Sequence, residues 1–298
     1  MPLVPDKAKQ FEFSTPTFVV IAAIHIFAIV LAPFTFSWPG LIAMTVVGYA
    51  TGGFGVTLCY HRLLTHSSYK TYRPIKYLLT ILGIMALEGG PIKWTATHRV
   101  HHKESDETPD PHTPFQGFLW SHVLWLFYTD PELGTYDQYQ RFAKDLGRDP
   151  VMRFLDKWNF VIYLLGLAAL FVVGWLVADW KLGLSLFVWG GLLRTVLVWH
   201  GTWLVNSATH MWGYRNYLTS DNSRNTWWVA LISFGEGWHN NHHADQRSAA
   251  HGHKWYEFDI TYLTIKAMSF IGLASDVVKP RNKDRMIRGD DAVQNNAA

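Results

Sequence analysis

Long apolar runs alternate with polar stretches along this 298-residue chain. Two runs of about 20 residues, 17–36 and 41–60, are separated by a Pro-Gly turn. Two more, 160–178 and 182–210, are separated by a short polar turn. As a helix, each is long enough to cross the roughly 30 Å hydrocarbon core of a bilayer. The pattern therefore predicts four transmembrane helices arranged as two hairpins.

Shorter apolar segments lie between these runs. Residues 75–87 form an apolar run of about 13 residues, too short to cross a membrane. We expect a helix there that lies at the membrane surface or packs under the polar part of the chain. Segments 115–128 and 227–238 are rich in aromatic residues, which suits the headgroup region.

The distribution of lysine and arginine predicts the orientation. Twelve lie between residues 61 and 158, ten follow His210, and the two hairpin turns contain only Lys181. By the positive-inside rule, both termini and the polar parts 61–159 and 211–298 are cytoplasmic. We expect one domain over residues 1–298, an all-α membrane protein whose cytoplasmic parts form a helical cap.

Composition excludes several other classes of protein. Apolar residues make up 49% of the chain and charged residues 16%, which is typical of a membrane protein and not of a soluble globule. The single cysteine, Cys59, excludes a disulfide within the chain. A net charge of +3 is too small to suggest binding to nucleic acid.

Histidines cluster on what we expect to be one side of the membrane. His98-Arg99-Val100-His101-His102 and His239-Asn240-Asn241-His242-His243 each place three imidazoles at i, i+3 and i+4, one face of a helix. The candidate ligands are His61, His66, His98, His101, His102, His210, His239, His242 and His243. Nine exceed a single zinc site and suit two metal ions with four or five ligands each.

Other polar residues support this centre or offer an alternative to it. Asn206 lies four residues before His210 and could complete a metal shell through a water. Candidate acids that could orient the imidazoles are Glu104, Asp106, Glu107 and Asp110. His25 and His200 lie within spans, and if they faced each other they could hold a haem. The remaining histidines, His112, His122, His251 and His253, are interpreted as structural or surface residues.

Three motifs carry a resemblance to a known family. His61-Arg62-Leu63-Leu64-Thr65-His66 and the two clusters above resemble the histidine boxes of the membrane fatty-acyl desaturases, in particular the Δ9 (stearoyl-type) branch and its bacterial and cyanobacterial acyl-lipid members. The resemblance covers about residues 49–273 and includes the Asn-Ser-Ala-Thr-His stretch ending at His210. It implies a non-haem di-iron centre that uses O2 and two external electrons to insert a cis double bond, expected at Δ9, into a saturated C16 or C18 acyl chain.

The resemblance also implies residues that line an acyl tunnel. Trp94 and Thr202 match the kink of the tunnel, and Trp203 follows Thr202 as in the family. Tyr49 and Gly53 match positions near its closed end. Glu88 stands where the family usually has a glutamine, and Lys93 replaces an acidic residue, so we hypothesise that these two side chains form an ion pair.

The same resemblance leads to expectations about the acyl carrier, the electron donor and the membrane that holds the protein. Ala96 and Thr97 stand where acyl-CoA desaturases tend to carry an Arg-Asp pair, which favours an acyl chain on a membrane glycerolipid over acyl-CoA. The chain carries no fused cytochrome, so we expect a ferredoxin or a separate cytochrome b5 as electron donor. We expect a bacterial plasma or thylakoid membrane.

Rival interpretations remain open at this point. A di-iron hydroxylase or ketolase acting on a lipid or carotenoid would share the scaffold. A histidine-rich metal transporter would place its ligands at mid-membrane. A haem electron carrier would use His25 and His200 and leave the histidine boxes unexplained.

Overall fold

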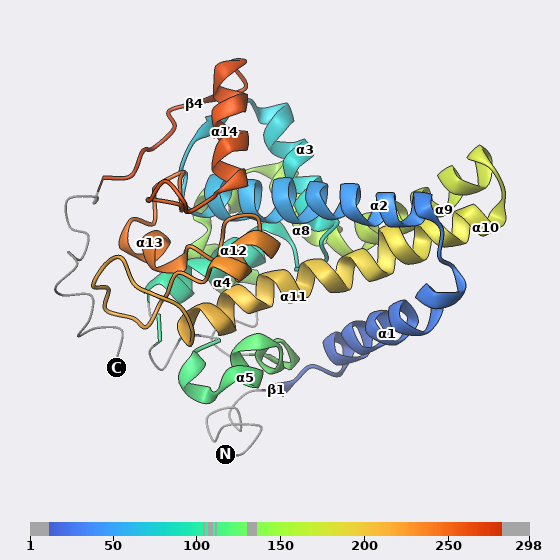
Figure 1. Ribbon diagram of the computed structural model, residues 1–298, viewed down its shortest axis with the longest axis horizontal. Helices are drawn as coiled ribbons and strands as arrows, with labels where there is room; N and C mark the ends of the chain where they lie inside the picture. Colours follow the sequence, from blue (N-terminus) through green and yellow to red (C-terminus); the bar gives the residue numbers. More distant parts are fainter. Residues whose placement is uncertain (1–11, 104, 107–109, 111, 130–135, 282–298) are drawn as a thin grey trace.

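The computed structural model describes residues 12–281, except 104, 107–109, 111 and 130–135, and this part of the chain is mostly helical (Figure 1). Within the described residues, four helices are long and apolar enough to cross a membrane, which confirms the four predicted spans. They extend together to one side of the molecule, and the shorter helices of the cap gather at the other.

The spans are built from the following elements. The first joins α1 (Thr15–Leu31) to η2 (Ala32–Phe34), and the second joins α2 (Trp38–Gly48) to η3 (Tyr49–Thr65). The third is α9 (Asn159–Val177). The fourth runs through α10 (Trp180–Ser185), η6 (Leu186–Leu193), α11 (Arg194–Ser207) and η7 (Ala208–His210).

Caps and small residues explain how each hairpin closes. The Ser37 hydroxyl accepts from the Gly40 amide to begin α2, and the Asp179 carboxylate accepts from the Leu182 amide to begin α10. Between α9 and α10, a side chain at Gly174 would lie 2.7 Å from the backbone of Gly183. Such close approach of two backbones in a membrane bundle requires a small residue.

The second span differs from the sequence prediction at its end. The prediction ends it at residue 60, whereas the helix continues to Thr65. Its last part, η3, is π-helical, with backbone hydrogen bonds one residue wider than in an α-helix. The continuation keeps His61 on a rigid helix instead of placing it in a loop.

The cap consists of short helices and two small antiparallel strand pairs. Its helices are α3 (Arg73–Ile84), α4 (Pro91–Lys103), η4 (Pro114–Gln116), α5 (Phe118–His122), η5 (Leu124–Phe127), α6 (Tyr136–Phe142), α7 (Lys144–Gly147), α8 (Pro150–Lys157), α12 (Trp227–Ile232), α13 (His239–Ala244) and α14 (Ile260–Phe270). Strand β1 (Glu12–Phe13) pairs with β3 (Tyr128–Thr129), and β2 (Lys70–Thr71) pairs with β4 (Ala274–Ser275).

The short apolar segments form helices, though shorter ones than their sequence suggests. Residues 75–87 correspond to α3, which packs along η3 so closely that a side chain at Gly55 would meet the backbone of Gly83 at 2.3 Å. Segment 115–128 is divided among η4, α5 and η5, and segment 227–238 is helical only as far as Ile232.

A buried arginine joins the second span to the cap. The Arg62 side chain is fully buried, and its guanidinium donates to the carboxylates of Glu236 and Asp259 at 3.1 and 2.9 Å. Two carboxylates compensate the desolvated cation, which would otherwise be costly. This cluster fixes the end of η3 against the segments that precede α13 and α14.

Candidate metal centre

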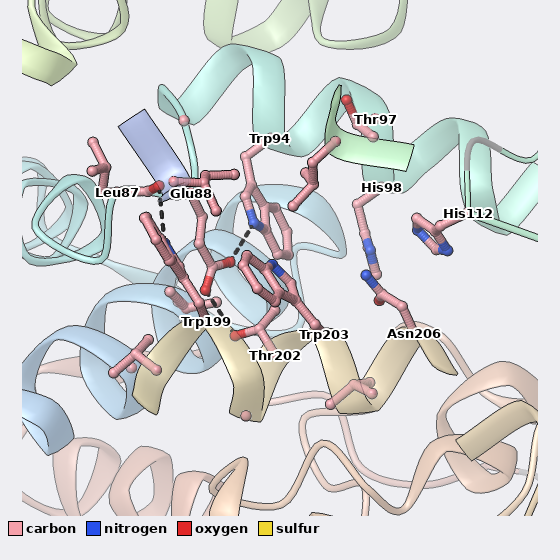
Figure 2. Close-up of a pocket in the computed structure, with 18 of the residues that line it drawn as sticks. Leu87, Glu88, Trp94, Thr97, His98, His112, Trp199, Thr202, Trp203 and Asn206 are labelled. Atoms are coloured by element: carbon pink, nitrogen blue, oxygen red, sulfur yellow. Dashed lines mark hydrogen bonds between the residues drawn. The ribbon is translucent and has the colours of Figure 1, made fainter. Parts of the chain in front are cut away.

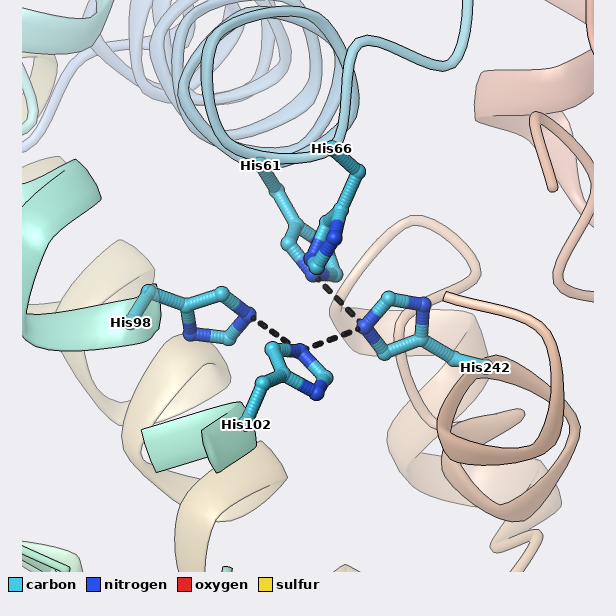
Figure 3. Close-up of side chains that lie close together, drawn as sticks. All are labelled: His61, His66, His98, His102 and His242. Carbon is cyan, nitrogen blue, oxygen red and sulfur yellow. Dashed lines mark hydrogen bonds between the residues drawn. The ribbon is translucent and has the colours of Figure 1, made fainter. Parts of the chain in front are cut away.

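Nine buried or half-buried histidines converge in two groups where the spans meet the cap. The first group is His61, His66, His98, His102 and His242, and the second is His101, His210, His239 and His243. Within each group, one ring nitrogen from every histidine lies within 4.8 Å of the others. Figure 3 shows the five imidazoles of the first group pointing toward one another from three separate elements. Together the two groups contain all nine candidate ligands from the sequence.

The π-helical end of the second span explains why His61 and His66 meet. On an α-helix, residues five apart point about 140° away from each other. In a π-helix the hydrogen bond joins i to i+5, so these residues lie on the same face. The His66 amide donates to the His61 carbonyl at 3.2 Å, and the ring centroids are 4.8 Å apart. The spacing of the first motif therefore matches the unusual helix that carries it.

Each of the other two motifs is divided between the groups. On α4, His98 and His102 belong to the first group and His101 to the second. On α13, His242 belongs to the first group, whereas His239 and His243 belong to the second. The i, i+3, i+4 spacing thus lets one short helix supply both groups at once.

Ring nitrogens within the groups make more close contacts than hydrogen bonds can satisfy, because each nitrogen carries either one hydrogen or one lone pair. The His242 Nε2 atom is 3.0 Å from Nε2 of His61 and 2.9 Å from Nε2 of His102. The Nε2 atoms of His66, His101 and His243 are buried without a hydrogen-bond partner among the described residues. Imidazole nitrogens that converge, some of them without a hydrogen-bond partner, are suited to bind two transition-metal ions.

Carboxylates hold the outer nitrogens of four of these rings. The Nδ1 atom lies 2.5–3.0 Å from a carboxylate oxygen in the pairs His61–Glu236, His101–Asp110, His210–Asp106 and His243–Asp221. Such partners set the orientation and tautomer of a ligand imidazole so that Nε2 faces the metal.

Two of these four acids, Asp106 and Asp110, are among those predicted from the sequence, and two, Glu236 and Asp221, are not. The other predicted acids, Glu104 and Glu107, lie outside the described residues. Glu236 stands three residues before His239, and this proximity to the third motif was the available signal.

Electrostatics favour neutral imidazoles in five of the nine histidines and an ionised carboxylate at Glu236. Burial, reinforced by neighbouring imidazoles, lowers the pKa of His66, His98, His102, His239 and His242 well below the usual range. The pKa of Glu236 is also well below its usual range, because His251, His61 and Arg62 outweigh the desolvation that opposes its ionisation. Neutral imidazole is the form that binds a metal ion.

Two histidines that the sequence analysis set aside lie next to the groups. His251 is fully buried, its Nδ1 is 3.0 Å from Glu236, and its ring centroid is 4.4 Å from that of His242. The ring of His112 lies 4.3 Å from that of His101 between centroids. Both contact histidines of the two groups, a position that their isolated places in the sequence do not reveal.

A cavity of about 1410 Å³ is lined by histidines of both groups and by residues of the spans. Figure 2 shows part of its wall. His61, His98, His239 and Asn206 line it beside the metal centre. Farther along, the Glu88 carboxylate accepts from the Trp94 indole at 3.0 Å and from the Thr202 hydroxyl at 2.7 Å, as Figure 2 shows. These three expected tunnel residues therefore meet at one point of the cavity wall.

The hypothesis of an ion pair between Glu88 and Lys93 is wrong. Glu88 directs both carboxylate oxygens to Trp94 and Thr202, and it forms no ion pair with Lys93. The Lys93 ammonium instead lies 5.6 Å from the ring centroid of Tyr139. Glu88, in the loop before α4, and Lys93, on α4, therefore contact different neighbours.

The remaining tunnel candidates occupy different positions. Tyr49 lines the cavity, and its hydroxyl lies 3.1 Å from that of Thr264. Gly53 is not among the described residues that line the cavity. A side chain at this position would meet the Tyr49 ring at 2.9 Å, so the glycine makes room for the ring. Trp203 lines the cavity and stacks on Trp199 with centroids 5.5 Å apart.

His25 and His200 face each other, as the haem alternative requires, but they are in direct contact. Their Nε2 atoms are 3.2 Å apart, and Nδ1 of His200 lies 3.0 Å from Nε2 of His122. The His25 ring also stacks on Trp199 and Trp203. These rings fill the space that a porphyrin would need, so the geometry favours a hydrogen-bonded row of side chains.

Comparisons with known proteins agree with the site. Residues 35–268 match the fatty acid desaturase family. The chain is 47% identical to an "sn-1 stearoyl-lipid 9-desaturase" of Anabaena variabilis, over 82% of this chain and 86% of the relative. It is 38% identical to an "sn-2 palmitoyl-lipid 9-desaturase" of Nostoc sp. (strain 36), over 93% and 94%. An "Acyl-CoA 5-desaturase AL21" of Anemone leveillei is 40% identical over 93% and 85%. On this evidence the chain belongs to the fatty acid desaturase family.

Proposed function

We propose that this desaturase inserts a cis double bond at Δ9 of a saturated C16 or C18 chain carried by a membrane glycerolipid. The observation that supports this most strongly is the cavity that passes both histidine groups and continues between the spans. An acyl chain in it would present its middle methylenes to the metal centre. The names of two relatives, which specify position 9 of stearoyl and palmitoyl lipids, support the same position and carrier.

The nine histidines are proposed to hold two iron ions, with Asn206 contributing through a water. Imidazole ligands without cysteine suit iron, and the carboxylates behind four of the rings would strengthen their binding. Bound there, such a centre supplies the oxidation that consumes O2, two electrons and two protons while two hydrogens leave adjacent methylenes, giving a cis alkene and two waters.

The side chains of the cavity are proposed to set which methylenes react. Trp94, whose ring stacks on His98 with centroids 5.0 Å apart, joins the metal centre to the kink at Glu88 and Thr202. Fixing the chain in one bent shape beside the ligands favours the cis product at one position. Tyr49 and Trp203 would limit the space beyond the kink.

Electron supply and orientation complete the proposal. A ferredoxin or a separate cytochrome b5 is proposed to deliver the electrons from the cytoplasmic side, to which parts 61–159 and 211–298 are assigned. Residues 1–298 are proposed to act as one domain in a bacterial plasma or thylakoid membrane. Both termini would then face the cytoplasm together with the metal centre.

Expression in a desaturase-deficient host tests the proposal. We expect new 9-unsaturated C16 or C18 chains in glycerolipids, with double bonds located by mass spectrometry of derivatised esters. His101→Ala, in the same host, should give none. A double bond at another carbon would overturn the regiochemistry, and hydroxylated products would move the chain to the hydroxylase alternative.

A further inference from the structure

Large apolar side chains are exposed on one side of α14 (Ile260–Phe270) and just after it. Phe270 is 92% exposed, and Leu263 and Ile271 are exposed as well. Leu263 and Phe270 are two turns apart, which places them on one face of the helix, with Lys266 and Ala267 between them. We call these five residues the outer face of α14. Exposed apolar side chains that gather on one element mark a contact with another protein or with a membrane.

The other face of α14 packs on the second span. The Thr261 hydroxyl lies 2.8 Å from that of Thr57, and the Thr264 hydroxyl lies 3.1 Å from that of Tyr49. Thr261 and Ile265 are buried. These α14 residues lie opposite the outer face on a helix of 3.6 residues per turn, so the contact with the span turns the outer face away from the protein.

The positions of these contacts along the second span give the depth of α14 in the membrane. The span begins at Trp38, which is exposed at the hairpin turn on the far side from the cap. At a rise of about 1.5 Å per residue, Tyr49 and Thr57 lie no more than about 17 and 29 Å from this start. The hydrocarbon core is roughly 30 Å thick. Both contacts with α14 therefore fall within the hydrocarbon thickness, the second one close to its boundary on the side of the cap.

The helix lies along this boundary and does not cross the bilayer. Figure 1 shows α14 running across the direction of the spans. Its 11 residues reach only about 17 Å, which is too short to cross the hydrocarbon core. Lys266 on the outer face has a long apolar stem, which lets its ammonium extend to the headgroups. Beyond Ile271 the chain returns to a polar edge, where the exposed side chains of Lys70 and Asp276 form an ion pair at 2.8 Å.

We propose that the outer face of α14 is a membrane contact, with Phe270 and Ile271 inserted among the acyl chains at the bilayer surface on the side of the cap. The face continues the lipid-exposed surface of the second span, because the two elements are joined at the depth of the hydrocarbon. A water-soluble partner would have to displace lipid to reach it. The contact adds a surface anchor to the four spans. It also connects the bilayer to the acyl cavity, because Tyr49, which Thr264 contacts, lines that cavity.

Nitroxide labels in the reconstituted holoenzyme test this placement. Phe270→Cys accepts the label at an exposed position, whereas Cys59, the single cysteine of the chain, is fully buried and should stay unlabelled. In phosphatidylcholine vesicles, collisions of the label with O2, which concentrates in hydrocarbon, are compared with collisions with a water-soluble nickel chelate. We expect the label at residue 270 to favour O2 over the chelate severalfold.

Two matched positions give the limits of this ratio. Leu165→Cys replaces an exposed residue of the third span and should show the ratio of a label that faces lipid. Lys144→Cys replaces an exposed residue of α7 in the cap and should show the ratio of a label that faces water.

The ratio at residue 270 decides the proposal. A ratio like that at Leu165 supports the membrane contact, and a ratio like that at Lys144 would overturn it. Slow collisions with both reagents would overturn it too, and dipolar broadening between labels would then identify a second copy of the chain as the cover. None of these measurements depends on turnover, so they test the contact separately from the proposed function.

Discussion

The Glu88 carboxylate accepts a hydrogen bond from the Thr202 hydroxyl at 2.7 Å on the wall of the acyl cavity. Burial raises the pKa of Glu88 to about 7, although the hydrogen bonds from Thr202 and Trp94 oppose the shift. A side chain on the proposed path of the acyl chain is therefore expected to change its charge near neutral pH. We predict that this couples acyl binding to pH.

Acyl binding should weaken as Glu88 ionises. We expect KM to rise severalfold between pH 6 and pH 8, because a charged carboxylate against hydrocarbon is unfavourable. Glu88→Gln keeps the shape and both hydrogen-bond partners but cannot ionise, so its KM should stay level over this range. Steady-state rates at fixed lipid composition measure both profiles. A wild-type KM that does not change with pH would contradict this role.

Stability should depend on pH through the same group. The unfolded chain releases this proton near pH 4.5, whereas the folded protein keeps it until about pH 7. Stability contributed by the protonated form is therefore lost as pH rises through this window, by roughly 3 kcal/mol at most. Glu88→Gln should match the wild type in thermal unfolding near pH 4 and exceed it at pH 8. Parallel unfolding curves at all pH values would count against the raised pKa.

Removal of one imidazole should empty one metal position. His242 belongs to the first group and contacts both His61 and His102, so His242→Ala should retain about one metal ion and lose activity. His25→Gln alters a histidine outside both groups and should keep two ions. Metal analysis of the purified proteins, with a spectrum to detect haem, distinguishes them. Two ions retained in the His242 variant would mean that the groups are assigned wrongly.

The carboxylates that contact the candidate ligand imidazoles should contribute strongly to metal affinity. Asp221 holds Nδ1 of His243 at 2.5 Å, so Asp221→Asn should weaken metal binding about 10- to 100-fold. Competition with a chelator gives the affinity. Asp276→Asn removes a surface partner of Lys70 and serves as the matched control. Equal affinities in the two variants would show that Asp221 does not orient the ligand.

Local patterns predicted the spans and the nine histidines that converge in the two groups, because both depend on spacing along one helix. Twenty apolar residues and an i, i+3, i+4 face are visible in the sequence itself. The π-helix that unites His61 with His66 was not predicted, since its wider turn is selected by packing against α3 and the cap. Glu236, Asp221 and His251 reach the centre only through the tertiary fold. The predicted ion pair between Glu88 and Lys93 is wrong because proximity in sequence does not determine the direction of a side chain.

Regiospecific removal of hydrogen is the central claim, and isotope labelling tests it most directly. The host would be fed stearate carrying two deuterium atoms on each of carbons 9 and 10. We predict oleate in glycerolipids with one deuterium left on each of these carbons, and no such oleate when His101→Ala replaces the wild type. An octadecenoate that keeps all four deuterium atoms, and so has its double bond at other carbons, would contradict it, as would a labelled chain that gains a hydroxyl without a double bond.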